Sequence, residues 1–309
     1  MDWVSGEELF ATLSMERAVR AIQRDLLAGL DPAHDLARVI DVLDHGQLLY
    51  MPSHFGEFVG AKVSTVAPNN PAIGLDRIHG IYVLMDAVTL VPVAMMDGQA
   101  LTALRTPAVS AAVADHLAPE RVEHLVVFGS GTQAWGHIEA VRVIRDVATV
   151  SVVARDSRRS ANLVDRLVAS GQPARIGAPG DVTSAEVIVC ATTARTPLFD
   201  GQSVPKDALV IAVGSHEPDV RELDTTTMAR SQVVVEDPAV ALREAGDVIM
   251  AIDEGRFAGS ALVAMRDVVT GAVAVDRTRP RVFKSSGMPW QDLVVAAEVH
   301  HARTGAADH

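Results

Sequence analysis

Residues 125–134 decide the fold, and they read Leu125-Val126-Val127-Phe128-Gly129-Ser130-Gly131-Thr132-Gln133-Ala134. The first four residues form a continuous apolar run, which is typical of a strand buried on both faces of a parallel sheet. A glycine-rich turn follows this run, and residues 133–145 have a helical pattern. A turn of this kind between a buried strand and a helix is the context that a dinucleotide-binding loop requires.

The small residues of this turn each have a physical task. Gly129 permits the tight turn, and Gly131 lets the backbone approach a pyrophosphate. Ala134 lets the helix pack on the strand, while the helix N-terminus offers N–H groups and the positive end of its dipole. The alternative is a turn that carries glycines for other reasons. We predict that NAD(P)(H) is bound by the six residues of this turn, Gly129, Ser130, Gly131, Thr132, Gln133 and Ala134.

The chain has 309 residues, which suggests about two domains. Two patterns of predicted secondary structure divide it. Beyond the glycine-rich turn, predicted strands such as 187–190 and 209–213 alternate with helices, which indicates βαβ units and a parallel, Rossmann-type sheet. Before the turn, residues 38–97 hold short β-type runs separated by Gly, Pro, Asn and Asp, which predicts a small antiparallel sheet. The predicted fold class is α/β, with an α+β domain beside the Rossmann domain.

Helices are expected at both ends of the chain and between the predicted antiparallel sheet and the predicted Rossmann-type sheet. Ser5 and Glu8 form a capping-box pattern at the start of the first helix. Residues 98–117 are rich in Ala, Leu and Val and predict one long helix, in which Pro107 predicts a late start or a kink. Residues 290–303 are expected to form a helix that returns to the first domain.

The bulk composition excludes several classes of partner. A net charge of −12 argues against nucleic acid and anionic membranes, since both need clustered Lys and Arg. The single cysteine, Cys190, forms no internal disulfide, and no histidine–carboxylate cluster has metal-ligand spacing, so no metal is expected. The chain start lacks a hydrophobic signal core, and Asp86 and Asp97 interrupt the apolar stretch 81–104, so we expect a cytoplasmic location.

The choice between NAD and NADP is read at the end of the second strand of such a domain. Here that strand ends in Arg155-Asp156-Ser157-Arg158-Arg159, with Arg155 in the recognition position and Arg158 close by. Cations suit a 2′-phosphate, so NADP(H) is favoured over NAD(H). Two alternatives stay open, namely that Asp156 binds the ribose of NAD, or that the arginines form only a solvated surface cluster.

Several motifs in order along the chain carry a family resemblance. They are Gly60–Pro71, Asp97–Ser110, Phe128–Ala134, Val213–Asp224 and Phe283–Leu293. Through them the chain resembles the ornithine cyclodeaminase/μ-crystallin family over essentially its whole length. The resemblance implies a substrate-binding and dimerisation domain at 1–116, completed by the C-terminal helix at 288–309, a Rossmann domain at 117–287, and a homodimer.

The resemblance also implies a group of cations that holds a substrate carboxylate and assists at the reacting carbon. By motif this group is Arg38, Lys62 and Arg105, of which Arg38 is placed only by its distance ahead of residues 48–52. The chemistry agrees, because a guanidinium binds a carboxylate in bidentate fashion. A lysine near two arginines and an apolar nicotinamide face has a depressed pKa and exchanges protons near neutrality. The alternative for Lys62 is a strand-end lysine that reaches solvent.

The chain departs from the ornithine cyclodeaminases at two positions. His216 stands where those enzymes carry an aspartate that grips the distal ammonium of the substrate, and Val220 stands where they carry a lysine. An imidazole does not replace a carboxylate as the partner of an ammonium group, so ornithine is not an expected substrate. His216 can donate a proton or orient water, since its unperturbed pKa is about 6.5. The alternative is a loop histidine that bonds only to backbone.

Further cofactor contacts are expected from loops that follow the predicted strands. They are Thr192 and Val213, together with Ser286 and Gly287 of a loop that approaches the nicotinamide in the family. For Asp292 the sequence supports only a role at a helix N-terminus.

The leading functional hypothesis is an NAD(P)H-dependent reductase of a small, cyclic imine carboxylate, in which Lys62 or His216 manages the proton. A cyclodeaminase or an alanine-type amino-acid dehydrogenase is the second hypothesis. The third is a non-catalytic protein in which NADPH orders a ligand pocket, and the presence of Lys62 and Arg105 counts against it.

Overall fold

The computed structural model describes residues 2–305, and the chain divides into two compact units. The first unit contains the residues up to Val109 and those from Met288 onward, and the second is Ser110–Gly287. The division therefore falls inside helix α3, Gly98–Leu117, whereas the expected boundary lay at the end of that helix. The last four residues of the expected range 288–309 lie outside the described residues.

The first unit is built on a six-stranded sheet with the order β1-β6-β5-β4-β3-β2 among the described residues. Its strands are β1 (Asp2–Val4), β2 (Val39–Leu43), β3 (Gly46–Phe55), β4 (Phe58–Val66), β5 (Ile78–Asp86) and β6 (Pro92–Asp97). The antiparallel meander from β2 to β6 confirms the predicted sheet, while β1, which pairs in parallel with β6, was not predicted.

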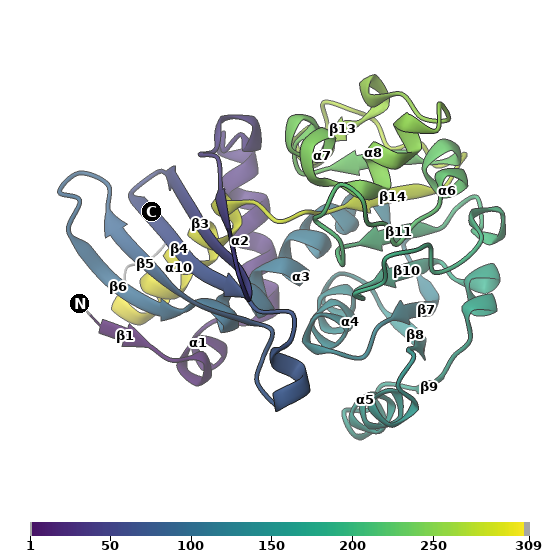
Figure 1. Cartoon of the computed structure of the whole chain (residues 1–309), viewed down its shortest axis with the longest axis horizontal. Helices are drawn as coiled ribbons and strands as arrows, with labels where there is room; N and C mark the ends of the chain where they lie inside the picture. The colour runs from purple at the N-terminus through teal and green to yellow at the C-terminus, as the bar shows by residue number, and fades with distance from the viewer. Residues whose placement is uncertain (1, 306–309) are drawn as a thin grey trace. The chain divides into compact units, whose positions relative to one another are not determined.

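Helices cover one face of this sheet. Helices α1 (Gly6–Thr12) and α10 (Pro289–Thr304) contact its strands, and α2 (Met15–Leu27) packs on α10. Figure 1 shows α10 in yellow against the strands, and its contacts are with β3, β4 and β5. The capping box of Ser5 and Glu8 at the start of α1 is confirmed. Helix α3 begins at Gly98 and includes Pro107, so the late helix start suggested by that proline is wrong.

The second unit contains an eight-stranded sheet with the order β13-β12-β14-β11-β10-β7-β8-β9, and every strand pair in it is parallel. Its strands are β7 (Val122–Phe128), β8 (Val147–Val153), β9 (Ala174–Ile176), β10 (Val187–Cys190), β11 (Leu209–Ala212), β12 (Gln232–Val235), β13 (Val263–Ala264) and β14 (Arg281–Lys284). Strand order reverses between β7 and β10, because the chain passes from β7 to β8 and β9 on one side and then to β10 on the other. The predicted Rossmann-type α/β fold is confirmed, and such a reversal is where these sheets bind ligands.

Six helices of the second unit connect these strands within the described chain. They are α4 (Thr132–Ile144), α5 (Ser157–Ala169), α6 (Thr225–Arg230), α7 (Pro238–Glu244), α8 (Gly246–Asp253) and α9 (Met265–Val269). The residues of β10, β11, β12 and β14 are all buried, as expected of strands covered on both faces. Among residues 2–305, no helix is long and apolar enough to cross a membrane.

Candidate active site

The glycine-rich turn of the second unit has the geometry that a pyrophosphate requires. Gly129 has a φ of +118°, and a Cβ added there would collide with the carbonyl oxygen of Ala191, so only glycine fits. Gly131 is the N-cap of α4, no side chain within the described residues caps that helix end, and a Cβ added to Gly131 meets nothing within 4 Å. Ala134 is fully buried. Open space in front of an uncapped helix N-terminus fits a dinucleotide pyrophosphate.

The end of β8 presents an exposed cluster of arginines. Arg155 and Arg158 are both exposed, and Asp156 is the N-cap of α5. One oxygen of Asp156 accepts the backbone N–H groups of Arg158 and Arg159, each at 3.0 Å. The Oδ1 atom of Asp156 is therefore engaged at the helix end, while its side chain stays 56% exposed.

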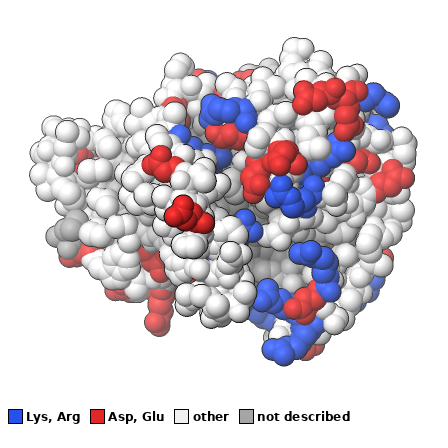
Figure 2. All heavy atoms as spheres, viewed as in Figure 1, with Lys and Arg blue, Asp and Glu red and all other residues white. Residues whose placement is uncertain are grey.

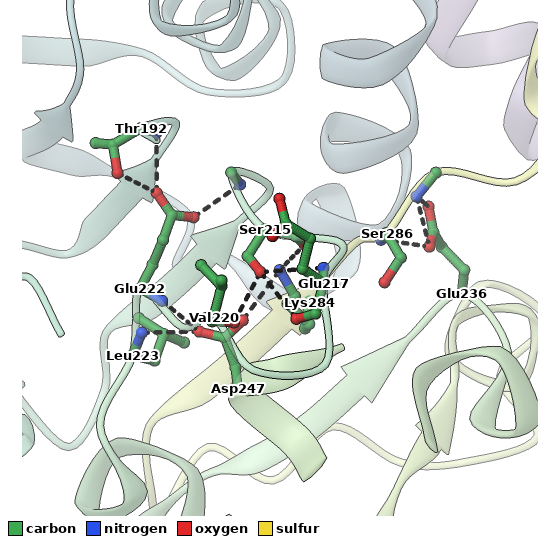
Figure 3. Close-up of polar contacts among 12 residues, drawn as sticks. Thr192, Ser215, Glu217, Val220, Glu222, Leu223, Glu236, Asp247, Lys284 and Ser286 are labelled. Carbon is green, nitrogen blue, oxygen red and sulfur yellow. Dashed lines mark hydrogen bonds and ion pairs between the residues drawn. The ribbon is translucent and has the colours of Figure 1, made fainter. Parts of the chain in front are cut away.

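Buried Glu222 holds the loops that follow β10 and β11 (Figure 3). It accepts the backbone N–H of Thr192 at 2.9 Å and the Thr192 hydroxyl at 2.7 Å, while its second oxygen accepts the N–H of Gly214 at 2.7 Å. Burial raises the pKa of this carboxyl. Thr192 and Val213 thus lie on two loops fixed by one carboxylate, at the carboxyl edge of the sheet.

A fully buried ion pair anchors the loop that carries His216 (Figure 3). Lys284 Nζ donates to the carbonyl oxygen of Ser215 at 2.6 Å and lies 3.1 Å from Asp247 Oδ2. The other oxygen of Asp247 accepts the N–H groups of Glu222 and Leu223 at 2.8 Å. His216 is half-buried and directly follows the anchored residue Ser215.

The loop after β14 is held by a third carboxylate. Glu236 accepts the Ser285 hydroxyl at 2.7 Å, the N–H of Ser286 at 2.8 Å and the N–H of Gly287 at 3.1 Å. These two backbone N–H groups serve to hold the loop. A cofactor contact through Ser286 or Gly287 would therefore use other atoms of these residues.

In the first unit, Lys62 lies at the centre of a buried polar group. It stands on the covered face of β4, and its side chain is only 3% exposed, so the alternative of a solvent-facing lysine is wrong. Its Nζ donates to Asp292 Oδ2 at 2.7 Å, to Asp292 Oδ1 at 2.9 Å and to the Thr102 hydroxyl at 3.1 Å. Arg105, on α3, donates to Gln291, and its Nε lies 3.4 Å from Asp292 Oδ1.

The pKa of Lys62 is lowered to about 8. Burial is the largest cause, and the charges of Arg105 and Arg38 act in the same direction, while Asp292 opposes them. Arg38 is half-buried and directly precedes β2. The structure thus places Arg38 and Arg105 close enough to Lys62 for their charges to act on it, and binding of a substrate carboxylate by this group stays a prediction.

Asp292 is the residue of this group that the sequence analysis missed. It belongs to the first turn of α10, but both of its oxygens accept from Lys62, and it is fully buried. The sequence carried one usable signal, since Asp292 sits within an otherwise mostly apolar run from Pro289 to Ala296 that is buried throughout. A carboxylate in such a run needs a cationic partner. Within residues 2–305, no group of three or more His, Cys, Asp or Glu side chains is arranged to hold a metal ion.

Comparison with known proteins identifies the family. The model of the ornithine cyclodeaminase/mu-crystallin family matches residues 6–306. The chain belongs to this family. Its relatives include a Delta(1)-pyrroline-2-carboxylate reductase of Bacillus cereus, which is 35% identical over 247 residues, or 78% of this chain and 76% of that protein.

Two other family members are similar over most of their length. A Delta(1)-pyrroline-2-carboxylate/Delta(1)-piperideine-2-carboxylate reductase of Azospirillum brasilense is 32% identical, covering 85% of this chain and 83% of that protein. The structure of the Delta(1)-pyrroline-2-carboxylate reductase of Thermococcus litoralis, in complex with NADH and L-proline, matches with a TM-score of 0.92 at 25% identity. That match covers 99% of this chain and 98% of that one.

Proposed function

We propose that this chain is an NAD(P)H-dependent reductase of a small cyclic imine carboxylate, of which Δ1-pyrroline-2-carboxylate is the first candidate. The observation that carries the proposal is buried Lys62, with a pKa near 8, grouped with Arg38 and Arg105 in a relative of the pyrroline-2-carboxylate reductases. A group of cations is suited to a carboxylate, and a lysine with this pKa is suited to proton exchange near neutrality.

The chain's own residues divide the work between binding and proton transfer. Arg38 and Arg105 hold the substrate carboxylate, and Lys62 gives a proton to the imine nitrogen. The bound reduced nicotinamide supplies the hydride that adds to the imine carbon. The C=N bond becomes CH–NH, so one hydride and one proton balance the reaction. Lys62 is preferred to His216 as the donor, because its pKa is already lowered and it lies beside Arg105.

For the cofactor we favour NADP(H). Arg155 and Arg158 are exposed at the end of β8, where a 2′-phosphate is read, and Asp156 is engaged in capping α5. The bound nucleotide would lie on the turn from Gly129 to Ala134. The cytoplasmic location expected from composition stays a prediction.

The deciding experiment is a substrate panel followed by the loss of NADPH absorbance. The panel contains Δ1-pyrroline-2-carboxylate, Δ1-piperideine-2-carboxylate, and pyruvate with ammonia, and ornithine is tested separately for release of ammonia and proline. We expect the cyclic imines to be reduced and ornithine to be a poor substrate, because His216 stands where the ornithine cyclodeaminases carry the aspartate that grips the distal ammonium, and buried Val220 stands where they carry a lysine. Robust proline formation from ornithine would overturn the proposal in favour of a cyclodeaminase.

A further inference from the structure

The carboxylate of Asp292 has no exposed surface, and burying an ionised carboxylate costs several kcal/mol unless it is paired. Its contacts are with cations on two other elements, Lys62 on β4 and Arg105 on α3. We propose that Asp292 is a positioning residue, the internal counter-ion that orients Lys62 for proton transfer and offsets the charge of the substrate-binding cations. This inference rests on the proposed function of Lys62.

Charge balance supports this role. Arg38, Lys62 and Arg105 carry three positive charges in or beside a buried region, and an imine carboxylate brings one negative charge. Without Asp292, two of the positive charges would remain uncompensated when substrate binds. With Asp292 in place, one remains, and it is the charge that Lys62 gives up when it passes its proton to the imine nitrogen.

The geometry fixes the direction of all three N–H bonds of Lys62. Two point to the oxygens of Asp292 and one to the Thr102 hydroxyl, whose own proton goes to the carbonyl oxygen of Gly98 at 2.7 Å. Because Asp292 accepts twice, Lys62 can redirect one N–H to a substrate nitrogen and keep the other bond to the carboxylate. The amine thus remains oriented before and after the proton leaves.

The groups that face Lys62 from each packed element set its proton affinity. They are Asp292 from α10, Thr102 and Arg105 from α3, Arg38 ahead of β2, and the cross-strand neighbour Tyr82 from β5. Burial and the charges of Asp292 and nearby Asp35 raise the pKa of Tyr82 well above its ordinary value, so its phenol is neutral. Asp292 is therefore the group that favours the charged form of Lys62, against burial and two arginines.

The test is the variant Asp292→Asn, measured by the pH dependence of kcat and KM for the imine carboxylate with NADPH. Removing the carboxylate disfavours the ammonium form, so Lys62 loses its proton at lower pH, by ~1–3 pH units. The alkaline limb of the kcat–pH profile should move to lower pH by that amount. At pH 7.5, kcat should fall about 10- to 100-fold, and it should recover partly at lower pH. KM should change little, because the positive charge lost from Lys62 offsets the negative charge lost from Asp292, and Arg38 and Arg105 stay charged.

A matched control comes from the same helix. Glu298 of α10 is a second carboxylate with only 4% of its side chain exposed, paired with Arg17 at 2.7 Å and Arg24 at 3.1 Å. The variant Glu298→Gln also removes a charge from a buried carboxylate on α10, although its partners Arg17 and Arg24 are about half exposed. It should lower Tm but leave the alkaline limb and KM unchanged. Equal shifts of the pH profile in both variants, or none in Asp292→Asn, would overturn the positioning role.

A second measurement separates this inference from the proposed reaction. The chain has three lysines, Lys62, Lys206 and Lys284, so the ¹⁵Nζ resonance of Lys62 can be assigned by its loss in Lys62→Met and titrated without substrate. We expect the titration of Lys62 to move to lower pH in Asp292→Asn. If it moves while no imine is reduced, the proposed reaction fails and the coupling of Asp292 to Lys62 stands. If it does not move, the inference itself is wrong.

Discussion

At the scale of the residue, Lys62 has an environment that differs from that of a usual lysine. Lysines are rarely buried unless they are paired, and Lys62 is paired with Asp292 on the covered face of β4. Burial lowers its pKa to about 8. At neutral pH, most Lys62 side chains are therefore protonated and can donate a proton, and a small fraction are neutral and can accept one. The proton transfer proposed for Lys62 depends on this burial as much as on its charge.

The variant Lys62→Met should lose imine reduction and keep NADPH binding. Removing a positioned proton donor costs about 10²–10⁴-fold in rate, and Lys62 lies in the first unit while the Gly129–Ala134 turn lies in the second. Arg105→Leu should instead raise KM, since a carboxylate clamp acts on ground state and transition state alike. Steady-state kinetics beside a fluorescence titration with NADPH measures both effects. A Lys62→Met enzyme that keeps more than about a tenth of wild-type turnover would make His216 the next candidate donor.

A second residue-scale prediction concerns Arg155. Because it is exposed at the end of β8, beside Arg158, NADPH should bind more tightly than NADH, and Arg155→Asp should reduce or reverse that preference. Arg195, an exposed arginine on another loop of the same unit, offers a control in Arg195→Asp, which should leave the preference unchanged. Equal affinities of the wild-type protein for the two cofactors would contradict the prediction.

At the scale of the element, α4 depends on a neutral histidine near its start. His137 is fully buried, its Nδ1 lies 2.8 Å from the carbonyl oxygen of Gln133, and its Nε2 lies 3.0 Å from the Ser110 hydroxyl. Burial lowers its pKa to about 4. This ring links the helix behind the glycine-rich turn to Ser110 of α3, and its burial disfavours the charged form.

Stability should consequently fall in acid. The folded-state pKa of His137 is below the ordinary value near 6.5, so the unfolded chain binds the proton first, and stability is lost as pH falls from 6.5 towards 4. The loss from this one group is about 1.4 kcal/mol per pH unit inside that window. Urea unfolding at pH 7, 6 and 5 measures this loss. In His137→Gln, the slope of the free energy of unfolding against pH should fall by the contribution of about one proton. An identical slope in the variant would show that other groups dominate.

At the scale of the whole molecule, the sheet of the first unit has an exposed face that carries large apolar side chains. They are Val39, Leu43, Tyr50, Val63 and Ile81, on β2 to β5, which the strand register places on one face. In Figure 2 the surface over these strands is mostly white, whereas blue and red side chains alternate over much of the second unit. A contiguous exposed apolar surface of this kind is typical of a protein interface.

We therefore expect a homodimer that pairs these faces. Ile81→Asp places a charge in the middle of the sheet and should shift the protein from dimer to monomer, as measured by light scattering at micromolar concentration. Val168→Asp, at an exposed apolar residue of α5 in the second unit, should leave the dimer intact. A wild-type protein that is monomeric at that concentration would contradict the expectation.

The sequence by itself determined the Rossmann fold and its glycine-rich turn. These depend on short-range patterns, since the strand, the turn and the start of α4 lie within about a dozen residues, and the φ of +118° at Gly129 is a property that only glycine supplies readily. The antiparallel sheet of the first unit was equally predictable in kind, because its alternation is local. Strand lengths and β1 were not, because pairing with neighbouring strands decides where an extended segment ends.

The group around Lys62 was decided only by the tertiary structure. Lys62 and Asp292 are 230 positions apart, and no local pattern relates them. Their contact arises because α10 packs on β4 and buries both charges on the same face, where each is stable only beside the other. The motifs identified Lys62, Arg105 and Arg38. The carboxylate beside them, Asp292, became apparent only from the packing of α10 on the sheet of the first unit.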